Sequence, residues 1–209
     1  MKQKLKNEKS RNRILQAALV EFGTKNYNSA TLNNICSQHG ISKGLIYHYY
    51  DGKDELFLIC VKECFDKLAN CLKNNIVLDA DTEESIKSYF QARNKFFEEK
   101  KEFKQIFMSA VLQPPIHLKS QIKELHKKLI EVNHMFAKSI FEKITLRQNV
   151  TPQEAMDYFI AFEEFFGEYF GRQQINLTNS EQLVKLHENT IYKIFDMMLY
   201  GIAKQEETL

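Results

Sequence analysis

The 209-residue sequence is poor in the residues that break regular structure, with 7 Gly, 3 Pro and no Trp. This scarcity excludes collagen-like repeats, low-complexity disorder and most turn-rich β architectures. The longest apolar run, around residues 57–61, is far shorter than the roughly 20 residues that cross a bilayer. No apolar segment follows the charged start of the chain, so we expect no membrane partner, no secretory signal and a cytoplasmic protein.

The four cysteines form no Cys-x-x-Cys pair, and without a secretory signal we expect reduced thiols. Cys60, Cys64 and Cys71 are spaced so that they point within about 40° of one another on a helix. That face is open to two interpretations, a thiol or metal sensor and small apolar packing. We favour packing and predict unreactive thiols. The six histidines show no paired ligand spacing, so we expect no metal and no cofactor.

Charge is distributed unevenly along the chain. Residues 1–53 carry nine cations and three acids, a net charge of +6, whereas the remainder carries −4. A basic N-terminal region beside a mildly acidic remainder suggests a region that binds a polyanion and a second region with another task. A solvated lysine-rich tail is the alternative explanation of the same charges.

Apolar residues recur at helical spacing, and we find neither strand alternation nor an internal repeat. The pattern predicts an all-α protein of about nine helices, over residues 9–25, 32–39, 42–49, 53–74, 82–98, 101–111, 114–144, 151–170 and 180–201. Ser42 is expected to cap the third helix, and Thr151 with Glu154 to form a capping box at the eighth. Asn26 is expected to end the first helix in the left-handed conformation.

The second and third segments are short and meet at Gly40, which predicts a helix-turn-helix. Its small core is expected to contain Ile35, Cys36, Ile41 and Ile46.

Residues 12–61 resemble the DNA-binding head of the TetR family of bacterial transcriptional regulators. The residues that carry the resemblance are Ile14-Leu15-x-Ala17-Ala18, Gly23, Thr31-x3-Ile35-Cys36 and Gly40-Ile41-Ser42-Lys43-Gly44-x2-Tyr47-x-Tyr49-Tyr50-x2-Lys53-x-Glu55-Leu56. The resemblance implies a three-helix helix-turn-helix DNA-binding domain over residues 1–52. It also implies a helical ligand-binding and dimerisation domain over residues 53–209.

The resemblance also implies which residues contact DNA: Thr31, Ser42, Lys43, Gly44, Leu45, Tyr47, His48, Tyr49 and Lys53. Lys43 at the start of the third helix can reach guanine O6 or N7 in the major groove, and Gly44 lets the backbone approach. Thr31 and Lys53 stand at helix starts, where free amides favour a phosphate. Tyr50 is expected in the core. The lysines before Ser10 either add DNA contacts or form a solvated tail.

The acidic remainder is rich in phenylalanine, and in this family such a region encloses an apolar space for a small inducer. We expect that pocket to include Cys64, Phe97, Phe107, His134, Phe159 and Phe162. We expect the last two helices to pair across a two-fold axis through Phe166, Gly167, Phe170, Gly171, Ile194 and Met198.

Three functions remain open at this point. The first is a ligand-responsive regulator, a repressor by preference, that binds a palindromic operator in double-stranded DNA as a homodimer and is released by an apolar or aromatic inducer. The second is a DNA-binding regulator without an inducer. The third is an all-helical enzyme, which the sequence disfavours because a di-iron bundle needs two Glu-x-x-His pairs and the chain has only Glu131-x-x-His134.

Overall fold

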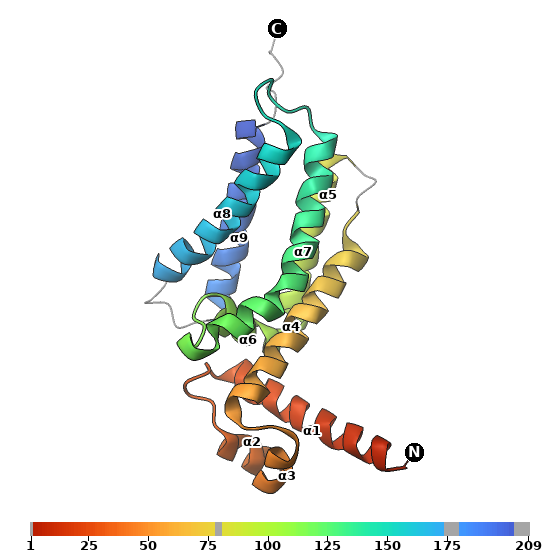
Figure 1. Cartoon of the computed structure of the whole chain (residues 1–209), viewed down its shortest axis with the longest axis vertical. Coiled ribbons are helices and arrows are strands. Elements are labelled where there is room, and N and C mark those ends of the chain that lie inside the picture. The colour runs from red at the N-terminus through yellow and green to blue at the C-terminus, as the bar shows by residue number, and fades with distance from the viewer. Residues whose placement is uncertain (1, 78–80, 174–179, 203–209) are drawn as a thin grey trace. The chain divides into compact units, whose positions relative to one another are not determined.

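The computed structural model describes residues 2–77, 81–173 and 180–202, with side chains except at residues 2, 168–173, 180, 200 and 202. These residues fold into nine α-helices and one short 3-10 helix, η1 (Figure 1). The elements are α1 (Lys2–Thr24), α2 (Leu32–His39), α3 (Lys43–Tyr49), α4 (Lys53–Asn75), α5 (Thr82–Glu99), α6 (Lys101–Val111), η1 (Ile116–Leu118), α7 (Lys119–Lys143), α8 (Pro152–Gln173) and α9 (Ser180–Ile202).

The all-α prediction is confirmed, and most helices begin and end near their predicted bounds. The Thr151 capping box is present, since the Glu154 amide donates to the Thr151 hydroxyl at 3.2 Å and the Thr151 amide donates to the Glu154 carboxylate at 2.9 Å. Two details differ from the predictions. The first helix begins at Lys2 rather than Lys9, and η1 separates the Pro114-Pro115 pair from α7.

The prediction for Asn26 was wrong. No non-glycine residue in the described part of the chain has a positive φ, so Asn26 does not adopt the left-handed conformation. Its side chain instead accepts a hydrogen bond from the Ser29 amide at 2.9 Å. A short polar side chain can close a turn in this way without the left-handed backbone.

The chain divides into two compact units, which consist of residues 1–66 with 100–126 and residues 67–99 with 127–209. In the first unit α1 packs on both α2 and α6. Gly23 allows the close approach of α1 to α6, because a Cβ at this position would lie 2.8 Å from the Glu102 backbone. The core of this unit is rich in phenylalanine, with the rings of Phe22 and Phe57 5.2 Å apart between their centroids.

In the second unit α5 packs against α9. The interior holds stacked aromatic rings, of which Tyr89 and Phe136 are nearly parallel with centroids 4.2 Å apart. It also holds a buried ion pair, in which the Arg93 guanidinium donates to the Glu188 carboxylate at 2.9 Å. Arg93 donates a further bond to the Tyr89 hydroxyl at 3.3 Å, and the His187 ring lies 3.1 Å from Glu188.

Two negative findings concern the described residues alone. None of their helices is both long and apolar enough to cross a bilayer. No group of three or more metal-ligating side chains occurs among them either.

Candidate nucleic-acid interface

Helix α3 is short, and its two ends are fixed by hydrogen bonds. The Ser42 hydroxyl accepts from the Leu45 amide at 3.2 Å, which confirms the predicted cap. At the other end the Tyr50 amide donates to the Ile46 carbonyl at 2.9 Å. Ile46 and Tyr50 are both buried, as predicted for Tyr50. The buried side chains on the inner side of α3 therefore anchor the helix, and its outer side is free to contact a partner.

The outer side carries the residues that the sequence assigned to DNA. Lys43, Gly44 and His48 are exposed, and Tyr47 exposes 58% of its surface although it is aromatic. Nothing lies within 4 Å of the position that a Cβ on Gly44 would occupy. Leu45 is half-buried. A lysine, a phenol and an imidazole on one open two-turn helix can donate hydrogen bonds to base edges and phosphates in a major groove.

Thr31 caps α2, and its hydroxyl accepts from the Asn34 amide at 3.2 Å. Its own amide donates to the buried carboxylate of Glu21 at 3.0 Å, and that carboxylate also accepts from the Asn34 side chain and from Lys25. Burial raises the pKa of Glu21, but these donors outweigh burial and the net pKa is lowered. Sequence reasoning missed Glu21, because an acid in an amphipathic helix gives no sign that it is buried.

Arg13 connects α1 to the turn of the helix-turn-helix. Its guanidinium donates to the carbonyls of His39 at 2.8 Å and Gly40 at 3.1 Å. Gly40 has φ 60°, a left-handed conformation that favours glycine, and it ends α2 as predicted. Arg13 was not among the predicted site residues, although it holds the turn that places α3.

Lys53 begins α4, as predicted, and lies over the ring of Tyr27 at 4.3 Å from the centroid. Its ammonium also donates to the Asn28 carbonyl at 3.4 Å. The Tyr27 hydroxyl donates to Asp54, and the His117 ring lies 2.9 Å from the same carboxylate. Burial, followed by the bond to Asp54, raises the pKa of Tyr27. The Tyr27 ring and the Asn28 carbonyl therefore hold the Lys53 side chain, for which a phosphate contact is predicted.

Tyr49 differs from its neighbours on α3 because its hydroxyl is already bonded. It donates to the Asn7 side chain at 3.0 Å, and the guanidinium of Arg11 lies 5.3 Å from its ring. Tyr49 is accordingly half-buried, whereas Tyr47 and His48 are exposed.

Residues 14–60, which span the C-terminal part of α1, all of α2 and α3 and the start of α4, match the family model described as "Bacterial regulatory proteins, tetR family". The helix-turn-helix region of the chain is thus similar to that of the TetR family. The family that this region resembles is described as one of regulatory proteins.

Relatives of known function match over part of the chain. Over 86 residues it is 30% identical to IcaR of Staphylococcus epidermidis, a negative transcriptional regulator of the biofilm operon icaADBC. The aligned residues are 41% of this chain and 44% of IcaR, so the chain spans less than half the length of the curated relatives it matches.

Solved structures match over nearly the whole chain. A transcriptional regulator from Rhodococcus superposes with a TM-score of 0.64 at 15% identity, over 93% of this chain and 98% of that one. FadR of Bacillus subtilis, solved with stearoyl-CoA, gives a TM-score of 0.61 at 15% identity, over 88% and 96%. At such identities the likeness shows the fold alone.

The predicted inducer-pocket residues fall in both compact units of the chain. Cys64 and Phe107 belong to the first unit, and Phe97, His134, Phe159 and Phe162 belong to the second. Within the second unit His134 and Phe159 are neighbours, with centroids 6.1 Å apart, and the His134 ring lies 2.8 Å from the Glu163 carboxylate. Burial raises the pKa of Glu163 despite this partner.

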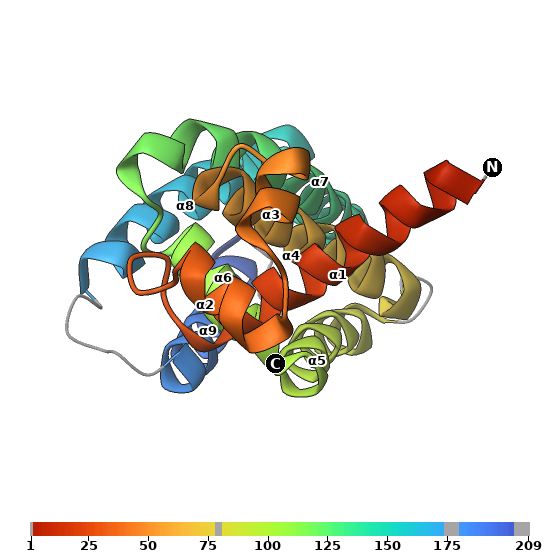
Figure 2. The same cartoon turned by 90° about the horizontal axis from the view of Figure 1, so that it is seen from below.

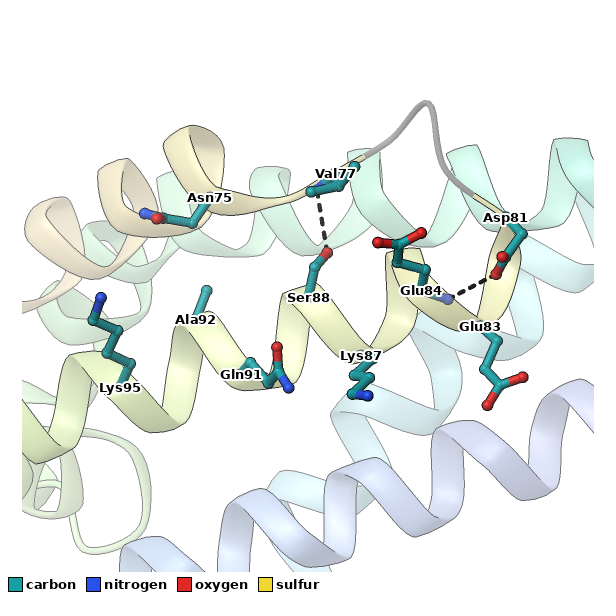
Figure 3. Close-up of a pocket in the computed structure, with 10 residues that line it drawn as sticks. All are labelled: Asn75, Val77, Asp81, Glu83, Glu84, Lys87, Ser88, Gln91, Ala92 and Lys95. Atoms are coloured by element: carbon teal, nitrogen blue, oxygen red, sulfur yellow. Dashed lines mark hydrogen bonds between the residues drawn. The ribbon is translucent and has the colours of Figure 1, made fainter.

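The structure contains a hollow of about 670 Å³ elsewhere, along one face of α5 near the end of α4 (Figure 3). Its lining is mostly polar and charged, and none of the six predicted pocket residues contributes to it. The lining residues are Asn75, Val77, Asp81, Glu83, Glu84, Lys87, Ser88, Gln91, Ala92 and Lys95.

The residues predicted to form the dimer interface differ in how much of their surface is exposed in the single chain. Phe166 is only 5% exposed, and its ring packs on His187 of the same chain at 5.4 Å, whereas the neighbouring Phe165 is 65% exposed. Gly167, Ile194 and Met198 are partly exposed. The side chain of Phe170 and residue Gly171 lie outside the residues whose side chains are described.

Proposed function

We propose that this chain is a transcriptional repressor that binds a palindromic operator as a homodimer in the cytoplasm and is released by a small apolar or aromatic inducer. The observation that carries the DNA-binding role is the outer side of α3. Lys43, Gly44 and Tyr47 are open there, while the inner side is buried and both ends are capped. Repression is supported by IcaR, which is a negative regulator.

The homodimer is supported by apolar side chains on the last two helices. Tyr158 and Phe165 on α8 are seven residues apart, and Leu186 and Met197 on α9 are eleven apart, so each pair shares a helical face. All four are exposed in the single chain. Exposed apolar rows of this kind mark interfaces, and a second copy of the chain would cover them.

The inducer is proposed from the aromatic interior of the second unit, where Phe159 has its ring among His134, Phe141 and Phe195. FadR, whose structure contains stearoyl-CoA, supports an apolar ligand. The same ring packing favours the second candidate, a regulator without an inducer, because closely packed protein interiors hold few voids larger than a water molecule.

Selection of duplexes from a random oligonucleotide pool tests the DNA-binding role. We expect the purified protein to retain a palindromic sequence. Lys43→Ala should relax the preference at one base pair, whereas Lys53→Ala should weaken all duplexes alike and lower the salt slope by about one unit per half-site. Absence of any selective retention by the wild-type protein would refute the proposed function.

Sedimentation and thermal shift test the other two parts. Phe165→Glu together with Met197→Glu should convert a dimer into a monomer, and a wild-type monomer at micromolar concentration would contradict the dimer. An apolar compound that raises the melting temperature and releases the selected duplex would establish an inducer by mass action. A compound library that does neither would favour the regulator without an inducer.

A further inference from the structure

The N-terminal turns of α1 carry a row of basic side chains on one face. Lys6, Lys9 and Arg13 are three and four residues apart, so they point within about 60° of one another. All three are exposed. Glu8, the one acid among the first twenty residues, lies on a different face of the helix. The row therefore presents positive charge without a neighbouring negative one.

Arg13 shows which way the row faces. Its guanidinium bonds to the carbonyls of His39 and Gly40, in the turn directly before α3. The row therefore starts on the side of α1 that faces the helix-turn-helix turn. At 1.5 Å per residue, Lys6 lies about 10 Å further along the helix axis than Arg13. That distance corresponds to about three base-pair steps of a duplex.

The same turns of α1 project beyond α2 and α3 and are nevertheless attached to α3 (Figures 1 and 2). The Tyr49 hydroxyl donates to Asn7, and the Arg11 guanidinium lies 5.3 Å from the Tyr49 ring and 5.8 Å from the Tyr50 ring. A projecting helix end is marginal in water by itself. These contacts connect it to the C-terminal end of the helix that carries Lys43 and Tyr47.

We propose that Lys6 and Lys9, with Arg13 at their base, form a second DNA-binding surface that contacts phosphates beyond the segment read by α3. Asn7 and Tyr49 are positioning residues for this surface. The inference rests on the proposed function, because it requires operator DNA on α3. The phosphate backbone is the fitting partner, since it is a regular polyanion and three exposed cations without a nearby acid complement it.

Single substitutions with a matched control test the surface. Lys6→Gln and Lys9→Gln each remove one charge from the row, and Lys4→Gln removes one from the opposite side of the same turns. Glutamine and lysine have similar helix propensity, so the three variants should keep the fold. For the selected duplex, each row variant should lower the salt slope by about 0.9 per half-site, which is about an eightfold loss of affinity at 0.1 M salt relative to 1 M. Lys4→Gln should leave the slope unchanged.

The failures of the two proposals are distinguishable. If the wild-type protein selects no duplex, the proposed function fails. If it selects one and Lys6→Gln, Lys9→Gln and Lys4→Gln all keep the wild-type slope, only the second surface is refuted. Replacement of single phosphates in the duplex by neutral methylphosphonates supplies an independent test. At one phosphate per half-site the replacement should lower the affinity of the wild-type protein and leave that of Lys6→Gln unchanged. An equal loss of affinity in both proteins at every phosphate would overturn the inference.

A double-mutant cycle tests the positioning role. Asn7→Ala and Tyr49→Phe remove no charge, yet both should lower the salt slope by loosening the N-terminal turns. Their effects should not add, because each breaks the same hydrogen bond. Additive losses, with the larger one from Tyr49→Phe, would instead mean that the Tyr49 hydroxyl contacts DNA directly and does not position the row.

Discussion

The two compact units use polar side chains in different ways. In the first, Arg13 donates to main-chain carbonyls of the turn before α3, and Glu21 accepts from the Thr31 amide and from the side chains of Asn34 and Lys25. These bonds fix the scaffold and leave the outer side of α3 free. In the second, Arg93 and Glu188 bond to each other from α5 and α9, 95 residues apart in sequence. The first arrangement is a set of local supports. The second depends on partners that are each costly to bury alone.

Breaking the ion pair of the second unit should have the largest effect. Glu188→Leu leaves the Arg93 guanidinium buried without its counter-charge, so we expect the free energy of unfolding to fall by about 3–5 kcal/mol. The double variant Arg93→Met, Glu188→Leu should recover most of that loss, because neither charge remains to be desolvated. Urea unfolding measures both. A double variant as unstable as the single one would show that packing, and not the unpaired charge, decides the cost.

The dependence of stability on pH provides a second test of the ion pair between Arg93 and Glu188. Burial raises the pKa of Glu188, but Arg93 more than reverses this and lowers the pKa from about 4.5 to about 2. A carboxylate with a depressed folded-state pKa stabilises the protein above its unfolded pKa and loses that contribution as the pH falls through the folded value. Wild type should therefore lose stability from pH 4.5 towards pH 2, and the double variant should lose less over that interval.

Glu21→Gln should break a local support in the first unit. It removes the charge that accepts from the Thr31 amide and from Lys25, and we expect a loss of about 2–3 kcal/mol. Hydrogen exchange should show the loss first at the amides of α2, and Glu8→Gln at an exposed position is the control. Equal acceleration of exchange in α9 would contradict the local character of this support.

Gly23→Ala should cost about 1–2 kcal/mol. The new Cβ would lie 2.8 Å from the Glu102 backbone, and this overpacking outweighs the better helix propensity of alanine. Gly167→Ala is the control, since nothing lies within 4 Å of its Cβ position in the single chain. Thermal melts compare the two variants. Equal melting temperatures would show that α6 can move away from α1 without cost.

Ser42→Ala should have the smallest effect, about 1 kcal/mol, because it removes one cap bond to the Leu45 amide. The variant separates the two functions of Ser42, which the family resemblance places at the DNA. A loss of affinity larger than the loss of stability would mean that the hydroxyl also contacts the duplex. Equal losses would limit Ser42 to its role as the cap of α3.

The sequence predicted the elements whose signals are local. Ser42, Thr31 and the Thr151 box are caps that depend on residues three positions apart, and the structure contains all of them. Gly40 was identified for the same reason. The family resemblance was carried by the same compact stretch of chain, and the matched residues 14–60 lie within it.

The sequence did not predict features that depend on distant residues. Nothing local distinguishes the buried Glu21 from the exposed Glu8, and the pairing of Arg93 with Glu188 follows only from the packing of α5 on α9. The helical start of α1 was missed because its support, Tyr49, lies 42 residues away from Asn7. The predicted inducer pocket has no comparable pattern, so its residues stay a prediction.

The buried thiols of α4 are natural reporters of local opening in the surrounding core. Cys60 and Cys64 are fully buried, and burial raises the pKa of both, whereas Cys36 and Cys71 are half-buried. Because the thiolate is the reactive species, an alkylating reagent can modify the first two only when the surrounding core opens. The alkylation rate of Cys60 and Cys64 therefore reports how often that core opens locally. Cys36 and Cys71 serve as reference positions, and no engineered probe is needed.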